Sequence, residues 1–201
     1  MVSLSEDCYD ERMKWKVLFL TCCIGFSVTA WAAPNVEKKV EYYDVKGWDL
    51  ARIQQEMNAN GPVDRNSGNR VWAHTTWRVR WNITYAEESI SCRPQSIEAV
   101  LYLEFVVPRW IERDKAPEAV QKKWDIFYAA LQKHEQQHAI FGYDAAKEIE
   151  EALMAIPKKR LCSQVREEAD ATSEKIIRKH NLRDIELDAK TDHGRAEGVV
   201  F

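Results

Sequence analysis

The sequence predicts an α+β fold: a small, mostly antiparallel sheet followed by a long helix and a second C-terminal helix. Two observations support this prediction. Alternating apolar residues, typical of strands, are concentrated in the first half of the chain. Apolar residues spaced three and four apart, typical of helices, dominate the second half. After a predicted leader over 1–32, residues 33–201 are long enough for a single domain with a real core.

Two strands are predicted in the middle of the chain. Residues 72–85 carry an alternating row that predicts one buried, aromatic-rich face. A turn region is expected over 87–95, and an apolar, β-branched run over 96–107 predicts a second strand that ends at Pro108. The buried row of the first strand consists of Thr75, Trp77, Val79, Trp81, Ile83 and Tyr85.

The remaining elements are a short strand and three helices. Residues 40–45 predict the strand, and residues 49–60 predict a helix that ends at a Gly-Pro pair. A long apolar stripe over 117–156 predicts the main helix. We expect either a kink or break near Gly142 or a partly exposed second half. Residues 160–180 suggest another helix, followed by an irregular tail.

The main helix contains the sequence H-E-Q-Q-H at residues 134–138. His134 and His138 are four residues apart, so they lie on one helical face, and both belong to the apolar stripe. Two imidazoles at this spacing can bind one Zn²⁺, which takes nitrogen ligands and, in catalytic sites, keeps a position for water. Glu135 is then expected to be the general base that acts on the zinc-bound water.

A catalytic zinc ion needs a third protein ligand. His193 is the best candidate, because it lies in a polar Thr-Asp-His-Gly turn of the tail where packing does not require a histidine. Asp188 or Asp192 is expected to orient its imidazole. Asp144 is the alternative third ligand, although on a continuing helix it points away from His138. Two further histidines, His74 and His180, are weaker candidates.

The N-terminus has the pattern of a cleaved export signal. Lys14 and Lys16 precede an uncharged, mostly apolar stretch over 17–30, and Ala30-Trp31-Ala32 is a small-x-small cleavage pattern. The preceding segment is acidic, and Met13 is an alternative start of translation. The stretch is too short to span a bilayer comfortably, so we expect a periplasmic or secreted protein that begins near Ala33, without a stable membrane span.

The cysteines agree with export. Only Cys92 and Cys162 follow the predicted leader, and two cysteines in an oxidising compartment most simply form one disulfide. The other three are Cys8, Cys22 and Cys23. The formal net charge of −3, with no basic patch and no glycine-rich loop, gives no indication of a nucleic-acid or nucleotide partner.

Several of these features together resemble a bacterial family labelled as predicted secreted zinc-dependent proteases and otherwise of unknown function. The resemblance covers about residues 40–201. It rests on the order of the features: a Trp-x-Val-x-Trp strand, a cysteine, a strand ending Val-Pro-x-Trp, HEQQH, a second cysteine and a final T-D-H-G. It supports His193 as a ligand and the Cys92–Cys162 pairing.

We therefore expect an exported zinc metalloprotease that binds one Zn²⁺ and acts on a protein or peptide substrate. The alternative is an exported interaction domain whose zinc site is structural or vestigial. A structural zinc site is closed by four protein ligands, whereas only three can be nominated here. An intact Glu135 also favours the enzyme, because a binding module does not require a base beside its ligands.

Overall fold

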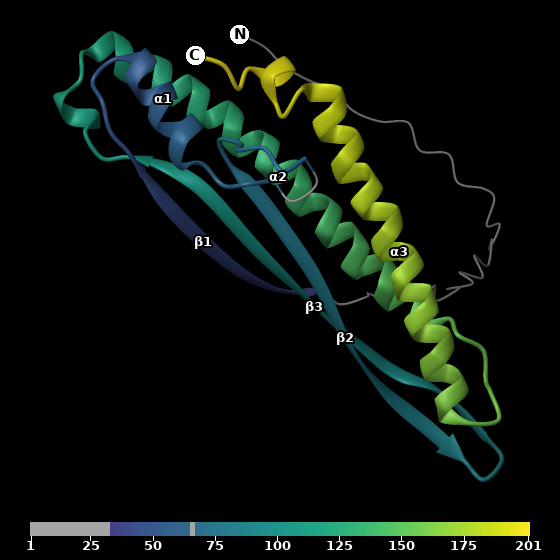
Figure 1. Ribbon diagram of the computed structural model, residues 1–201. Coiled ribbons are helices and arrows are strands. Elements are labelled where there is room, and N and C mark those ends of the chain that lie inside the picture. Colours follow the sequence, from purple (N-terminus) through teal and green to yellow (C-terminus); the bar gives the residue numbers. More distant parts are fainter. Residues whose placement is uncertain (1–32, 65–66) are drawn as a thin grey trace, which may run out of the picture. The chain divides into compact units, whose positions relative to one another are not determined.

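A three-stranded sheet in the order β1-β3-β2 forms one layer of the protein (Figure 1). The structure is a computed structural model that describes residues 33–64 and 67–201, so the predicted leader lies outside the described residues. Strand β1 (Asn35–Val45) pairs with β3 (Ser91–Trp110) in parallel. Strand β2 (His74–Glu88) pairs with β3 antiparallel through a hairpin.

The second layer is a pair of long antiparallel helices. Helix α2 (Glu118–Met154) covers one face of β2 and β3, and α3 (Cys162–Thr191) packs beside α2 (Figure 1). Helix α1 (Leu50–Asn60) follows β1. Two short 3₁₀ turns, η1 (Arg113–Lys115) and η2 (Arg195–Glu197), complete the elements. The arrangement confirms the α+β prediction, with a mixed sheet whose longer pairing is antiparallel.

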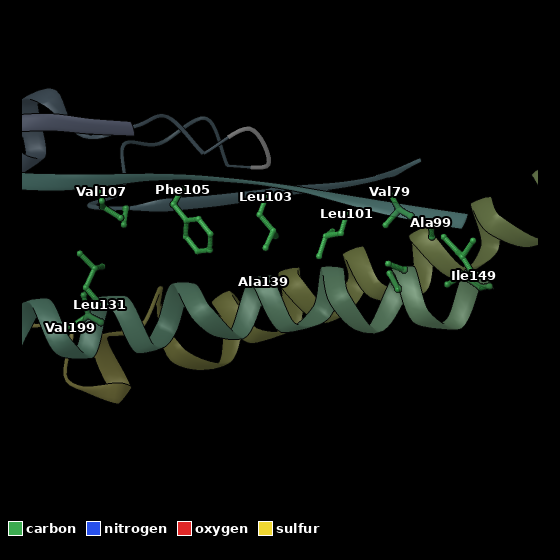
Figure 2. Packing of buried hydrophobic residues seen from close by; sticks show 14 of the residues in the cluster. Val79, Ala99, Leu101, Leu103, Phe105, Val107, Leu131, Ala139, Ile149 and Val199 are labelled. Atoms are coloured by element: carbon green, nitrogen blue, oxygen red, sulfur yellow. The ribbon is translucent and has the colours of Figure 1, made fainter. Parts of the chain in front are cut away.

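The core lies between the strands and α2. Figure 2 shows alternate residues of β3, from Ala99 to Val107, pointing at the helix, where Leu131, Ala139 and Ile149 face them. This row confirms that the predicted alternation marks a buried face. Removing these side chains from water is the main favourable term for the fold, at about 25 cal/mol per Å² of apolar surface.

Strand β3 is longer than the sequence predicts at both ends. It begins at Ser91, within the expected turn region, and continues through Pro108 to Trp110. The last residue of β3 that pairs with β2 is Val106, so Pro108 has only β1 beside it, opposite Tyr43. The missing N–H of proline therefore interrupts no antiparallel ladder, and proline is tolerated at such a position.

The break expected at Gly142 is also absent, because α2 is one helix from residue 118 to residue 154. A Cβ on Gly142 would lie 2.8 Å from the Cβ of Trp77. The glycine therefore allows close approach of the helix to β2, where Glu135 of the helix accepts a hydrogen bond from Thr75 of the strand.

Helix α3 was expected to end near residue 180, but it continues to Thr191. The prediction was wrong because the extra turns pack half-buried acidic side chains against the histidines of α2. Asp184 and Asp188 face the two histidines of α2. A search for apolar periodicity does not detect such a face.

Cys92 and Cys162 form the expected disulfide, which connects the start of β3 to the start of α3. Backbone hydrogen bonds of 2.8 Å join Cys92 to Lys159 in both directions beside it. Among the described helices, none combines the length and the apolar character needed to cross a membrane.

Candidate metal centre

His134 and His138 lie side by side on α2, buried against α3. Their side chains are only 3% and 8% exposed to solvent. The two Nε2 atoms are 3.3 Å apart, as the i, i+4 spacing of the motif predicts. Each imidazole therefore directs its Nε2 atom toward the same point.

Asp188 completes a triangle around that point. Its Oδ1 lies 3.1 Å from Nε2 of His134 and 3.2 Å from Nε2 of His138. A tetrahedral ion with bonds of about 2.0–2.1 Å holds its ligand atoms about 3.3 Å apart. The three atoms match this spacing, so His134, His138 and Asp188 form a group that could hold a metal ion.

The other nitrogen of each imidazole is held by a second carboxylate. Nδ1 of His134 lies 2.9 Å from Oε2 of Glu197, and Nδ1 of His138 lies 2.8 Å from Oδ1 of Asp184. A neutral imidazole with its proton on Nδ1 carries its lone pair on Nε2. These contacts therefore favour the tautomer that can bind a metal.

Two further side chains fix these carboxylates. The indole nitrogen of Trp77 donates a hydrogen bond of 2.7 Å to Oδ2 of Asp184. The amide of Gln137 donates to both oxygens of Glu197, at 3.0 and 3.1 Å. Strand β2 therefore supports the imidazole of His138 through Asp184, and Gln137 supports that of His134 through Glu197.

The carboxylates around the group favour positive charge on its two histidines. Burial lowers the pKa of His138, but Asp184 and Asp188 outweigh it and raise the pKa to about 10. The pKa of His134 is also raised, because Asp188 and Glu197 outweigh its burial. Burial acts to raise the pKa of Asp188, yet the two histidines hold it well below its usual range. Three converging acceptor atoms need either protons or a cation between them, and a divalent ion satisfies all three.

Glu135 is buried beside the histidines, with 5% of its surface exposed. Its Oε2 accepts a hydrogen bond of 2.6 Å from the hydroxyl of Thr75 on β2. Burial raises the pKa of Glu135, while the Thr75 hydrogen bond and the nearby histidines partly oppose the shift. A raised pKa suits a carboxylate that must accept a proton near neutral pH.

A pocket of about 150 Å³ opens onto this group. Residues from four regions line it: helix α1, the segment before and at the start of β2, helix α2, and the segment from α3 to the C-terminus. Among its lining residues are Trp72, His74, Glu135, Asp188, His193 and Arg195. The pocket gives solvent and a small ligand access to the three converging atoms.

Neither of the two predicted third ligands, His193 and Asp144, belongs to the His134, His138 and Asp188 group. His193 lines the pocket, with Nδ1 3.6 Å from Oδ2 of Asp188, but it lies outside the three-residue group. Asp144 does not join the group, and its Oδ2 accepts a hydrogen bond of 2.9 Å from Arg183. His74 lines the pocket, whereas His180 lies earlier in α3 than Asp184 and Asp188 and is buried against Glu148.

Sequence reasoning assigned Asp188 only an orienting role and missed Asp184 and Glu197. One signal was present in the chain. Asp184 and Asp188 repeat the i, i+4 spacing of His134 and His138, as expected for two antiparallel helices that face each other.

The fold and the site define a class: an α+β domain with a buried His/His/Asp group, able to hold a metal ion, between two antiparallel helices. The chain belongs to the family described as bacterial protein of unknown function (DUF922), which matches residues 40–194. The matched segment includes both histidines, Glu135 and Asp188. No curated protein and no solved structure matches the chain.

Proposed function

We propose that this protein is an exported zinc-dependent metallopeptidase in which Glu135 is the general base. One observation carries the proposal. Nε2 of His134, Nε2 of His138 and Oδ1 of Asp188 lie 3.1–3.3 Å from one another, while carboxylates hold both Nδ1 atoms. Two histidines and one carboxylate are a ligand set of catalytic zinc sites, which keep one position for water.

The residues of the chain divide the chemistry between them. When bound, zinc would supply a Lewis acid that activates water and polarises the scissile carbonyl. Glu135 accepts the proton of the attacking water and passes it to the nitrogen of the leaving amine. Thr75 orients the carboxylate for this transfer through its 2.6 Å hydrogen bond. The wall of the pocket formed by Trp72 and His74 gives the substrate a place beside the ion.

Export is part of the proposal. The leader pattern over 1–32 and the Cys92–Cys162 disulfide both suit an oxidising compartment such as the periplasm. The substrate we infer is a protein or peptide in that compartment.

The competing function is an exported interaction domain with a structural zinc ion. It would need a fourth protein ligand to close the site. His193 is the side chain near enough to provide one, because it already lies beside Asp188. The number of protein ligands at the bound ion therefore separates the two functions.

The proposal is tested with zinc-loaded protein and an unbiased peptide library, with products identified by mass spectrometry. We expect metal-dependent cleavage that is lost in Glu135→Gln, although that variant keeps its zinc. Glu151→Gln is the matched control, because Glu151 lies on the exposed side of the same helix, beside Lys147. Cleavage by Glu135→Gln at the wild-type rate, or no cleavage together with four protein ligands at the ion, contradicts the proposal.

A further inference from the structure

Strand β1 is an edge strand whose first eight residues, 35–42, are exposed on both faces of the sheet. It pairs with β3 on one side, and no described residue pairs with its other side. Figure 1 shows this strand at the margin of the sheet, away from α3. A long open edge exposes unpaired backbone groups that can form hydrogen bonds with another strand.

The side of β1 that faces the helix layer carries three exposed apolar or aromatic side chains. Val36, Val40 and Tyr42 are 42%, 39% and 55% exposed, and alternation places them on one face of the strand. Lys38 belongs to the same face, where its ammonium group lies 4.7 Å from the centre of the Phe105 ring. Exposed apolar side chains on an unpaired edge are suited to an interface.

We propose that β1 pairs with β1 of a second copy of the chain, antiparallel, around a two-fold axis at Val40. Val40 is the central residue of the strand Asn35–Val45, so this axis allows the longest pairing of the strand with its own copy. It places Lys39 opposite Glu41 of the second copy, twice by symmetry. It also places Lys38 opposite Tyr42 of the second copy, where a cation can lie over the ring.

The charges of β1 select this position of the axis. A two-fold axis perpendicular to the sheet places the same face of both copies of β1 on the same side of the sheet. One residue must then lie directly opposite its own copy, with the axis midway between them. An axis at Lys38, Lys39 or Glu41 would place a charged residue opposite its own copy, and like charges in directly opposite positions are destabilising. An axis at Val36 or Tyr42 would pair fewer residues.

The resulting dimer has a continuous six-stranded sheet with both helix layers on one side. The lining of the metal pocket includes no residue of β1. Dimerisation would therefore leave both pockets open, and variants of β1 should keep their metal content.

Charge reversal tests the pairing in the purified full chain, by sedimentation over the micromolar range. Lys39→Glu alone and Glu41→Lys alone each create two like-charged pairs and should weaken dimerisation roughly tenfold. The double variant restores opposite charges and should recover the dimer. Thermal unfolding of each variant checks that the internal pairs of Lys39 with Glu41 and Glu104 are not the cause.

Crosslinking tests the position of the axis. Val40→Cys should form a disulfide between copies on oxidation, because the two residues face each other. Val36→Cys is the matched control: it has the same side chain and similar exposure, but lies about 27 Å from its copy at about 3.4 Å per residue. The wild-type protein, which carries neither introduced cysteine, shows how much crosslinking occurs through Cys8, Cys22 or Cys23.

Two results would overturn the proposal. The first is a chain that stays monomeric throughout the micromolar range, both with and without residues 1–32. The second is crosslinking at Val36 that is as fast as at Val40.

Discussion

Trp77 and Asp184 are joined by a hydrogen bond of 2.7 Å from the indole nitrogen to Oδ2, and Oδ1 of the same carboxylate contacts His138 at 2.8 Å. This contact connects the aromatic row of β2 to the metal group. The partly buried tryptophan row therefore packs against the core and also supports the site.

Trp77→Phe should lower the metal affinity about tenfold, because Asp184 loses the donor that fixes its orientation toward His138. The ring volume that packs against Gly142 is largely kept. A competition titration with a chromogenic chelator measures the change. Trp81→Phe is the matched control on the same face of β2, and its affinity should equal that of the wild type. Equal losses in both variants would show a general packing effect.

His193→Ala should keep the bound ion, because Asp188 supplies the third ligand atom. We expect turnover to fall, since His193 lines the pocket next to the ligand group. Metal analysis after dialysis, together with a peptide assay, measures both effects. Loss of the ion would return His193 to the ligand set that the sequence predicts.

Replacing both Cys92 and Cys162 by serine should lower the free energy of unfolding by about 4 kcal/mol. The disulfide closes a loop with a sequence separation of 70, and opening the loop increases the entropy of the unfolded chain. Denaturant unfolding measures the change. The metal affinity should be unchanged, because the disulfide joins the starts of β3 and α3 and does not border the pocket. A fall in affinity would show that the disulfide shapes the site.

Glu148 gives the protein an acid-sensitive contribution to stability. Burial acts to raise the pKa of Glu148, but hydrogen bonds from Lys179 and His180 outweigh it and lower the pKa. A lowered pKa stabilises the fold above the unfolded value of the pKa, and this contribution disappears as the pH falls through the folded value. Glu148→Gln should therefore cost about 0.5 kcal/mol at pH 7, and nothing once the wild-type carboxyl is protonated.

Urea unfolding of the wild type and Glu148→Gln between pH 3 and pH 7 measures how the difference in their free energies of unfolding changes with pH. Lys179→Met removes the partner cation of Glu148 and should show a similar loss with the same dependence on pH. A difference between wild type and Glu148→Gln that stays constant over the range would exclude the charge as its cause.

Much of the fold could be predicted because apolar patterns report buried faces. The alternation before Tyr85 and the stripe of α2 both correspond to core residues. The pattern failed where the buried partner is polar. The last turns of α3 bury Asp184 and Asp188 against the histidines, so they carry no apolar signal.

The candidate site was predictable in part for the same reason. His134, Glu135 and His138 lie within five residues of one another, and helix geometry alone brings the two histidines together. Asp188 and Glu197 lie 54 and 63 residues from His134 in the sequence, and only the tertiary packing of α3 and the C-terminal turn brings them to the histidines. Spacing along the chain gives no sign of the Glu197 contact, and for α3 the one signal is the i, i+4 spacing of Asp184 and Asp188.

The most direct test of the central claim is the metal content of purified protein after incubation with zinc and removal of excess ion, measured by mass spectrometry. The account predicts one tightly bound ion per wild-type chain, lost in Asp188→Ala, and kept in Asp144→Ala, whose carboxylate pairs with Arg183. No tightly bound ion in the folded wild type, or an ion kept by Asp188→Ala and lost in Asp144→Ala, would contradict it.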